Sequence, residues 1–415
     1  MKNLLILGAG TAGTMVANRM QRRLPRGWSL TLVDPSPRHA YQPGLLFLPF
    51  GRADPDRLER PRRATLANDV YWIARDVDGI DRHAREVRLR GGIQLRYDLL
   101  VLATGARLRP DLTPGLQGPD WRKGIHEFYT LEGALALREA LAGFQGGRLV
   151  VDIVEMPIKC PVAPLEFTFL ADDFLRRRGI RSRTELVFAT PMDGCFTRPL
   201  ASRKLGRMVR ERDIEVEKEF ATGEVDPERR VVRSHDDREI SYDLLVVIPT
   251  HSGAAFVEAA GLGNELAFVP TDRETLQVSG DDHAFCLGDA TNLPASKAGS
   301  VAHFQAEVLE ENLLAVMAGR APEARFDGHA NCFVESGGGK ALLIDFNYQV
   351  EPLPGRYPLP GVGPFTLLGE SRVNHLGKVA FEWLYWNALL PGRPLPLPSR
   401  MSMAGKQAEA IADGA

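Results

Sequence analysis

A glycine-rich turn near the start of the chain limits the folds that this sequence can adopt. Lys2 to Leu7 is a short apolar run, predicted to be a strand, and it leads into GAGTAG, which carries Gly8, Gly10 and Gly13. A helical pattern follows the turn, and Asp34 comes about 20 residues further on, after a second predicted strand. A turn needed only for packing would not explain this acid. The combination predicts a dinucleotide site, in which backbone N–H groups approach a pyrophosphate and Asp34 accepts hydrogen bonds from a ribose.

A second strand, turn and helix lies in the middle of the chain, but its turn contains no glycine. Gly146 to Ile153 is predicted to form a buried strand and Leu165 to Arg177 a helix, and the turn between them carries Cys160 among several prolines. A nicotinamide-binding turn needs glycines so that backbone N–H groups can reach a pyrophosphate. We therefore expect NADH to bind poorly or not at all here. From the cysteine alone, an ordinary buried thiol is an equal alternative.

Two further apolar strands predict that the chain leaves its first domain and later returns. Tyr97 to Leu102 runs into Thr104 and Gly105, where a glycine lets the chain turn close to a cofactor, and Tyr242 to Ile248 repeats the strand pattern. The arrangement resembles the two-dinucleotide flavoproteins. It implies an α/β fold with two Rossmann-like, glutathione reductase-like domains and a C-terminal membrane-interface region. The expected parts are 1–108 (FAD-binding domain, first segment), 109–238 (second Rossmann-like domain with a degenerate nicotinamide site), 239–322 (FAD-binding domain, second segment) and 323–415 (quinone and membrane-interface region).

The same resemblance assigns a second group of cofactor contacts. The sequence AFCLGDA supplies Gly288 and Asp289, which in that superfamily bind the ribityl and pyrophosphate part of FAD. Lys297 follows, just before a predicted helix from Val301 to Val316. A lysine and a helix N-terminus beside a flavin stabilise negative charge on the reduced ring. A surface lysine is the alternative for Lys297.

The order of motifs along nearly the whole chain resembles the sulfide:quinone oxidoreductases and the flavin subunit of flavocytochrome c sulfide dehydrogenase. The motifs are GAGTAG, ATG, PIKC with Cys160, the Gly-Asp pair, the lysine after it, and Cys332 in NCF. The resemblance implies FAD and a redox-active pair of Cys160 and Cys332, in which Cys332 addresses the flavin and Cys160 carries sulfane sulfur. HS⁻ would attack the bridge between them, and the released thiolate would pass two electrons to the flavin. Many quinone-linked members have a third cysteine before the first redox cysteine, and the stretch from Ala106 to Lys159 contains none.

Other side chains near the cysteines have less specific signals. Glu166 follows Cys160 closely and is expected to accept a proton or tune the thiol, with a capping or surface carboxylate as the alternative. Cys286 is expected in the core, and Cys195 as a spare surface thiol. The four cysteines include no CxxC pair, so no metal site is expected.

The C-terminal stretch from Asn374 to Leu390 has apolar and aromatic residues at helical spacing, interrupted by Lys378 and Glu382. It is too short to span a bilayer, but tryptophan and tyrosine favour the membrane interface, which predicts a monotopic attachment. A helix buried against the body or a dimer partner is the alternative, and a homo-oligomer is compatible with the sequence. A lipid bilayer would supply a membrane quinone, ubiquinone or menaquinone, as acceptor. The candidate quinone or membrane contacts are Phe346, Tyr348, Phe365, Phe381, Trp383 and Trp386.

Composition excludes several other classes of protein. The formal net charge is −2 and no basic stripe is concentrated enough to predict a nucleic-acid partner. The chain has no signal-peptide pattern and no run of about 18 uncharged apolar residues, so we expect a peripheral membrane protein on the cytoplasmic face.

The predicted function is FAD-dependent oxidation of sulfide to sulfane sulfur or polysulfide, with electrons passed to a membrane quinone. A type II NADH:quinone oxidoreductase is an alternative that would need a glycine fingerprint in the middle domain. Two further alternatives are a flavocytochrome subunit and a flavin-containing binding protein whose cysteines no longer react.

Overall fold

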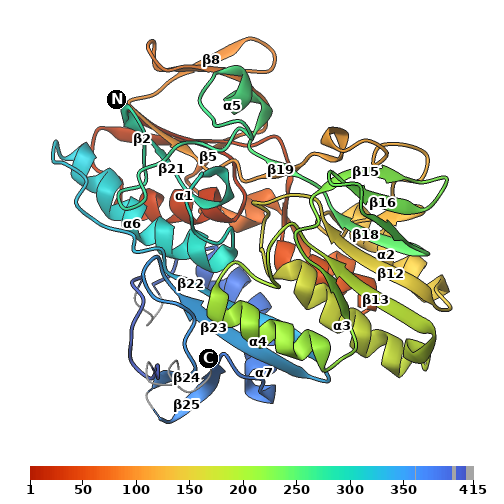
Figure 1. Cartoon of the computed structure of the whole chain (residues 1–415). Helices are drawn as coiled ribbons and strands as arrows, with labels where there is room; N and C mark the ends of the chain where they lie inside the picture. The colour runs from red at the N-terminus through yellow and green to blue at the C-terminus, as the bar shows by residue number, and fades with distance from the viewer. Residues whose placement is uncertain (360, 395–398, 408–415) are drawn as a thin grey trace.

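Two helix-flanked sheets lie side by side, and a third sheet packs beneath them in the view of Figure 1. The computed structural model describes residues 1–359, 361–394 and 399–407. The C-terminal region predicted over 323–415, including part of its proline-rich stretch 391–398, therefore falls partly outside the described residues. The predicted α/β class is confirmed, because the first two sheets are built mainly of parallel strands.

The first sheet joins the N-terminal segment to a later part of the chain. Its strand order is β20-β21-β9-β1-β2-β5, and β9 pairs in parallel with both β1 and β21. The apolar runs of β1, β2 and β9 place most of their side chains in the core, as expected for parallel strands covered on both faces. The strands are β1 (Lys2–Leu7), β2 (Trp28–Val33), β5 (Tyr71–Ile73), β9 (Leu99–Leu102), β20 (Gln277–Val278) and β21 (Asp281–Cys286).

The second sheet is parallel throughout, with the order β11-β18-β12-β13-β14. Its strands are β11 (Ile125–His126), β12 (Gly147–Ile153), β13 (Thr184–Ala189), β14 (Glu215–Glu217) and β18 (Leu244–Ile248). The position of β18 corrects one prediction, because this strand was assigned to the returning FAD segment 239–322 but pairs with β12. Both sheets end in apolar parallel strands of the same pattern, so periodicity alone does not tell which sheet receives the strand.

The helices cover these two sheets. In the first unit α1 and α6 pack side by side (Figure 1), joined by an ion pair between Arg19 and Glu310 at 2.5 Å. In the second unit α3 packs on β12 and β13. The helices are α1 (Thr11–Arg23), α2 (Leu131–Gly143), α3 (Ala163–Arg177), α4 (Pro199–Arg210), α5 (Ala255–Ala259), α6 (Gly299–Met317) and α7 (Arg372–Leu384).

The third sheet brings the second candidate cysteine to the same site as the first. Its order is β22-β23-β25-β24, and α3 and α7 both pack against β22. Cys332 lies near the start of β22, shortly after the irregular stretch 320–329, and is paired with Ile344. The strands are β22 (Ala330–Gly337), β23 (Lys340–Phe346), β24 (Gly355–Leu359) and β25 (Gly363–Leu367).

Smaller sheets lie at the edges, and of these β3 contributes Arg38, His39 and Ala40 to the lining of the site described below. They are β3-β4 (Arg38–Ala40, Glu59–Pro61), β6-β7-β8 (Val77–Asp81, Glu86–Leu89, Ile93–Arg96), β10-β19 (Arg107–Leu108, His251–Ser252) and β15-β16-β17 (Thr222–Asp226, Val231–Ser234, Glu239–Ser241).

The tail helix differs from the prediction of one regular helix over 374–390. Helix α7 ends at Leu384 and continues as a π-helical turn from Tyr385 to Leu389. A π turn closes i→i+5 hydrogen bonds, so ideal helical spacing no longer tells which later side chains face solvent. Trp383 is 68% exposed, whereas the nearby Trp386 is buried. Within the described residues, no helix combines the length and the apolarity needed to cross a bilayer.

Candidate functional site

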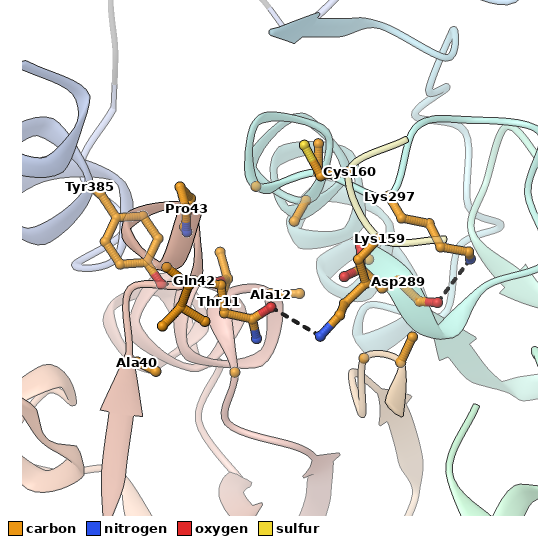
Figure 2. A pocket seen from close by; sticks show the side chains of 18 of the residues that line it. Thr11, Ala12, Ala40, Gln42, Pro43, Lys159, Cys160, Asp289, Lys297 and Tyr385 are labelled. Atoms are coloured by element: carbon orange, nitrogen blue, oxygen red, sulfur yellow. Dashed lines mark hydrogen bonds between the residues drawn. The ribbon is translucent and has the colours of Figure 1, made fainter. Parts of the chain in front are cut away.

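A single cavity of about 430 Å³ lies where the first sheet, α3, β22 and α7 meet. The turns after β1, β9 and β21 enter it from one side, and the PIKC turn, β22 and α7 line the rest. Figure 2 shows Thr11 and Tyr385 at one part of this cavity, and Cys160, Lys159 and Asp289 at another. Within the described residues, the cavity therefore joins the predicted dinucleotide turn to the predicted redox thiols.

The three fingerprint glycines have distinct roles. Gly8 adopts φ +94°, and a Cβ there would lie 2.5 Å from the carbonyl oxygen of Ala103. A Cβ on Gly13 would lie 1.9 Å from the carbonyl oxygen of Gly8, so this glycine serves backbone packing and does not line the cavity. Gly10 lines the cavity, and a Cβ added to it would have no atom within 4 Å, which leaves room for a ligand. This division of roles fits a dinucleotide pyrophosphate at the start of α1.

Asp34 lies at the predicted place, where it lines the cavity and also stabilises the glycine-rich turn. Its carboxylate accepts hydrogen bonds from the Ala9 N–H at 2.6 Å and the Ser36 N–H at 2.9 Å. The guanidinium of Arg62, which is almost fully buried, lies 3.2 Å from the same carboxylate. Sequence reasoning missed Arg62 because it belongs to an irregular segment with no motif.

The turn after β9 contributes an unsatisfied polar atom. Thr104 and Gly105 both line the cavity, and the buried Thr104 hydroxyl has no hydrogen-bond partner among the described residues. Gly105 adopts φ +68° with open space where a Cβ would be. Together with the open side of Gly10, this free hydroxyl fits a cofactor such as FAD, whose polar atoms would satisfy it.

The turn after β21 carries Gly288 and Asp289, and both line the cavity. Lys297 is buried, which rules out the surface-lysine alternative. Its ammonium donates hydrogen bonds to the carbonyl oxygens of Asp289 at 2.9 Å and Thr291 at 2.6 Å, and burial lowers the pKa of Lys297 to about 8. In this structure the lysine therefore holds the Gly-Asp turn, and it also lines the cavity.

Both candidate redox thiols reach the cavity, and each is a free cysteine. Cys160 adopts a left-handed backbone with φ +46°, and its N–H donates to the carbonyl oxygen of Lys297 at 2.7 Å. Non-glycine residues in this conformation are uncommon and cluster at functional sites. Of the other cysteines, Cys286 is in the core as predicted, but Cys195 is also buried, as part of the main hydrophobic core, and is not a surface thiol.

A buried ion pair lies beside the thiols. Lys378 Nζ is 3.0 Å from Glu166 Oε1, and Glu166 has no exposed surface, so the surface-carboxylate alternative is wrong. The Glu335 N–H also donates to Glu166 Oε1 at 2.8 Å, whereas Glu166 Oε2 has no partner among the described residues. Burial raises the pKa of Glu166 above its ordinary value, against the effect of the lysine. Lys378 was visible in the sequence only as an interruption of an apolar helix.

Charges around the thiols control how easily they ionise. Burial raises the pKa of Cys160 above its usual range, and the nearby Cys332 and Glu166 add to the shift. Burial also raises the pKa of Cys332 to about 11, although Lys378 lowers it. Burial disfavours the ammonium of Lys378, but the negative charges of its neighbours outweigh this effect and raise the Lys378 pKa. Lys378 is therefore a permanent cation at neutral pH beside both sulfurs.

Some aromatic candidates lie at the cavity and others do not. Phe381 lines it, and Phe365 packs at 5.4 Å on Phe333, a lining residue that sequence reasoning missed. Phe346 and Tyr348 lie outside the lining, where Phe346 stacks under the guanidinium of Arg198 at 4.9 Å.

The two tail tryptophans differ in exposure. Trp383 is exposed on the same face as Leu376 and Val379, which are 63% and 57% exposed. Trp386 is buried under Arg60, whose guanidinium lies 4.3 Å from the indole centroid, so its side chain does not reach the surface.

The cavity's features agree with what this chain is similar to. Residues 2–151 match the family model described as pyridine nucleotide-disulphide oxidoreductase. The chain is 27% identical over 396 residues to the mitochondrial sulfide:quinone oxidoreductase of Mus musculus, a match that covers 94% of this chain and 86% of that protein. It is 28% identical over 404 residues to the protein of the same name from Dictyostelium discoideum, with 94% and 86% covered.

The fold is similar to that of the sulfide:quinone oxidoreductase from Aquifex aeolicus, with a TM-score of 0.79, 20% identity, and coverage of 95% of this chain and 92% of that chain. Such a likeness supports the fold, and the curated relatives show a sequence similarity that extends over nearly the whole chain. The fit of the cavity to FAD agrees with both. Over nearly its whole length the chain is similar to sulfide:quinone oxidoreductases, and its N-terminal part matches the pyridine nucleotide-disulphide oxidoreductase model.

Proposed function

We propose that this protein oxidises sulfide to sulfane sulfur through Cys160 and Cys332, and passes the electrons through FAD to ubiquinone or menaquinone. One observation carries the proposal: two thiols from distant segments line the same cavity as the dinucleotide turn, with a buried lysine between the elements that bear them. The relatives named for sulfide and quinone support the substrate class.

The chain offers a complete set of side chains for FAD. Gly10, Thr104 and Gly105 leave space and a free hydroxyl at the cavity, and we expect Asp34 to bind the ribose and the Gly288-Asp289 turn the ribityl part, since all of them line the same cavity. If bound in this cavity, FAD would supply a two-electron acceptor for the thiols that line it.

The sulfur step begins from the oxidised form of the protein, in which a disulfide bond joins Cys160 and Cys332. HS⁻ attacks the Cys160 sulfur, a new S–S bond forms there, and the Cys160–Cys332 bond breaks. The electron pair of the broken bond leaves on Cys332 as a thiolate. When the deprotonated persulfide of Cys160 then closes on Cys332, a new S–S bond forms and two electrons are released, which bound FAD would accept and the quinone would take up. The sulfur that entered as sulfide remains on Cys160 as sulfane sulfur, two electrons more oxidised.

Lys378 and Glu166 serve this step by charge and by proton transfer. Burial raises the pKa of the Cys332 thiol and so makes its thiolate a poor leaving group, whereas the ammonium of Lys378 lowers this pKa and stabilises the departing thiolate. The free Oε2 of Glu166, a residue that lines the cavity, accepts the proton of HS⁻ once the new S–S bond has formed.

A lipid surface is the proposed place of the quinone. Helix α7 presents Leu376, Val379 and Trp383 to the outside, and Phe381 to the cavity. An exposed apolar stripe that includes tryptophan suits the membrane interface, and the quinone would reach the cavity past Phe381. Attachment as a peripheral membrane protein on the cytoplasmic face is part of this proposal.

The NADH-dependent alternative is less well supported. The turn that follows β12, residues 154–162, contains no glycine, and its backbone instead places Cys160 at the cavity. A nicotinamide pyrophosphate would lack the close N–H contacts it needs there.

Anaerobic stopped-flow absorbance tests the proposal. Sulfide is expected to bleach the flavin of the wild type and to leave that of Cys160→Ser and Cys332→Ser oxidised, whereas NADH should bleach none. Cys195→Ser is the matched control, since Cys195 is buried outside the cavity lining. Bleaching by NADH but not by sulfide would overturn the proposal. Flavin that neither reductant bleaches would favour a binding protein with inactive cysteines.

A further inference from the structure

The C-terminal part of α7 and the turn after it are tied to the dinucleotide site by contacts that the proposed reaction does not use. Lys378, Phe381 and Tyr385 all line the cavity, and they lie at the i, i+3 and i+7 positions of one helix face. This face runs from the thiols at one end to the GAGTAG turn at the other, so one segment borders the whole cavity.

The contact at the GAGTAG end is a directed chain of hydrogen bonds. The Ala9 carbonyl oxygen can only accept, so His39 Nδ1, 3.2 Å away, donates to it. His39 Nε2 must then accept, and its partner at 2.6 Å is the Tyr385 hydroxyl. The Tyr385 oxygen in turn accepts from the Thr11 hydroxyl at 2.8 Å. Tyr385 thus holds two residues of the turn that surrounds Gly10.

The segment is also fastened to α1 outside the cavity. Asn18 Nδ2 donates to the carbonyl oxygen of Leu390 at 2.9 Å, and Arg22 donates to the carbonyl oxygens of Pro391, at 2.8 Å, and Gly392. Neither Asn18 nor Arg22 lines the cavity. These contacts fix where the segment lies without touching a bound cofactor.

We propose that residues 378–392 form a strap that closes the FAD site, with Tyr385 bonded to the GAGTAG turn, and that FAD dissociates only when this strap moves away. The strap borders the cavity along its length and is held at three places: at Lys378 by Glu166, at Tyr385 by the turn, and at its end by α1. The inference rests on the FAD site of the proposed function, and of the three contacts only the Lys378–Glu166 pair also takes part in the proposed sulfur chemistry.

The rate of FAD release tests the strap directly. Released FAD is followed by the rise of its fluorescence after the flavin-loaded enzyme is diluted, with no turnover involved. Tyr385→Phe removes the hydroxyl and leaves His39 and Thr11 without their partner, so FAD should dissociate about tenfold faster. Tyr348→Phe is the matched control, because its hydroxyl bonds the Arg273 carbonyl oxygen at 3.2 Å away from the cavity.

The Arg22→Ala variant distinguishes a strap that must move before FAD leaves from a contact that acts only locally at Tyr385. Arg22 touches the strap but not the cavity, so its loss should speed FAD release about threefold only if the strap must move. Arg82→Ala is the control, since Arg82 also donates to a backbone carbonyl, that of Gly280 at 2.9 Å, far from the strap. Unchanged release in Tyr385→Phe, or faster release in Tyr385→Phe but not in Arg22→Ala, would overturn the proposal.

Hydrogen exchange gives an independent reading. Because binding equilibria are reciprocal, FAD should slow amide exchange in residues 385–392, and exchange that FAD leaves unchanged would count against the strap. Failure of the proposed function can be told apart from failure of the strap proposal. If the proposed function is wrong, sulfide will not bleach the flavin, but the FAD release rates will still show whether the strap must move. A protein that binds no FAD at all would refute both.

Discussion

Lys378 Nζ lies 3.0 Å from Glu166 Oε1, and this buried ion pair borders both thiols of the cavity. Lys378 belongs to α7 and Glu166 to the first turn of α3, so the pair forms only when the C-terminal segment folds onto the middle of the chain. It supplies the positive charge that the thiolates need and a carboxylate oxygen that can take a proton.

Replacement of Lys378 should slow the sulfur chemistry. In Lys378→Met the thiolates lose their cation, and a nearby opposite charge shifts a pKa by about 1 to 3 units, so flavin reduction by sulfide should fall by about 10- to 1,000-fold. Lys378→Arg should retain most of the rate, and Lys340→Met, on the exposed start of β23, all of it. Stopped-flow bleaching checks the rates, and an unchanged rate in Lys378→Met would remove the lysine from the mechanism.

Loss of the lysine should also destabilise the fold, and a second substitution should rescue it. Lys378→Met leaves Glu166 buried without its cation, which costs about 3 kcal/mol of unfolding free energy. Lys378→Met combined with Glu166→Gln should recover most of this loss, because no uncompensated charge remains. Urea unfolding of the two variants and wild type measures the difference. A double variant as unstable as the single one would show that packing, not charge, is responsible.

Substitutions at Gly10 and Gly13 should affect different properties, FAD binding in the first case and the stability of the fold in the second. Gly10→Ala adds a methyl group where the protein leaves open space at the cavity, so the chain should fold but bind FAD at least about tenfold more weakly. Gly13→Ala places a Cβ 1.9 Å from the Gly8 carbonyl oxygen, so it should lower the thermal stability of the apoprotein as well. Thermal unfolding and FAD titration of both variants test this; equal thermal stability would contradict it.

Asp152 should make stability depend on pH. It has no exposed surface, accepts hydrogen bonds from Thr222 Oγ1 at 2.9 and 3.0 Å, and burial raises its pKa to about 7. Between about pH 4 and 7 the unfolded chain has lost this proton while the folded chain keeps it, so stability falls as pH rises, by on the order of 4 kcal/mol.

Asp152→Asn removes that titration. Unfolding free energies measured at pH 5 and pH 8 should differ less in this variant than in the wild type, and the variant should be the more stable protein at pH 8. Asp226→Asn, at a partly exposed carboxylate, should keep the wild-type slope. The same slope in Asp152→Asn would mean that other groups cause the pH dependence.

The exposed stripe of α7 should bind lipid. Leu376→Asp introduces a charge into this stripe, so partition onto vesicles of anionic phospholipid should fall by about tenfold. Leu112→Asp, at an exposed leucine in the distant 3₁₀ turn Pro110–Leu112, is the control. Co-sedimentation with vesicles measures the partition, and equal loss in both variants would argue against a specific attachment by α7.

The sequence by itself determined the local parts of this protein. GAGTAG, Asp34 and the first apolar strand predicted the dinucleotide turn, because steric rules tie glycine spacing to one backbone path. The sequence also showed directly that the turn after β12 has no glycine and carries a cysteine instead. The order of these motifs identified the family before any contact was known.

Tertiary structure alone decided which distant residues share the cavity and which side of the tail is covered. The buried Arg62, the Lys378–Glu166 pair and the contact of Tyr385 with the GAGTAG turn depend on how α7 crosses the other elements. Apolar periodicity shows that a helix has a face to bury, but not what that face will meet, and a π turn changes the face partway along. Trp383 and Trp386 therefore look alike in the sequence, yet one is exposed and the other lies in the core.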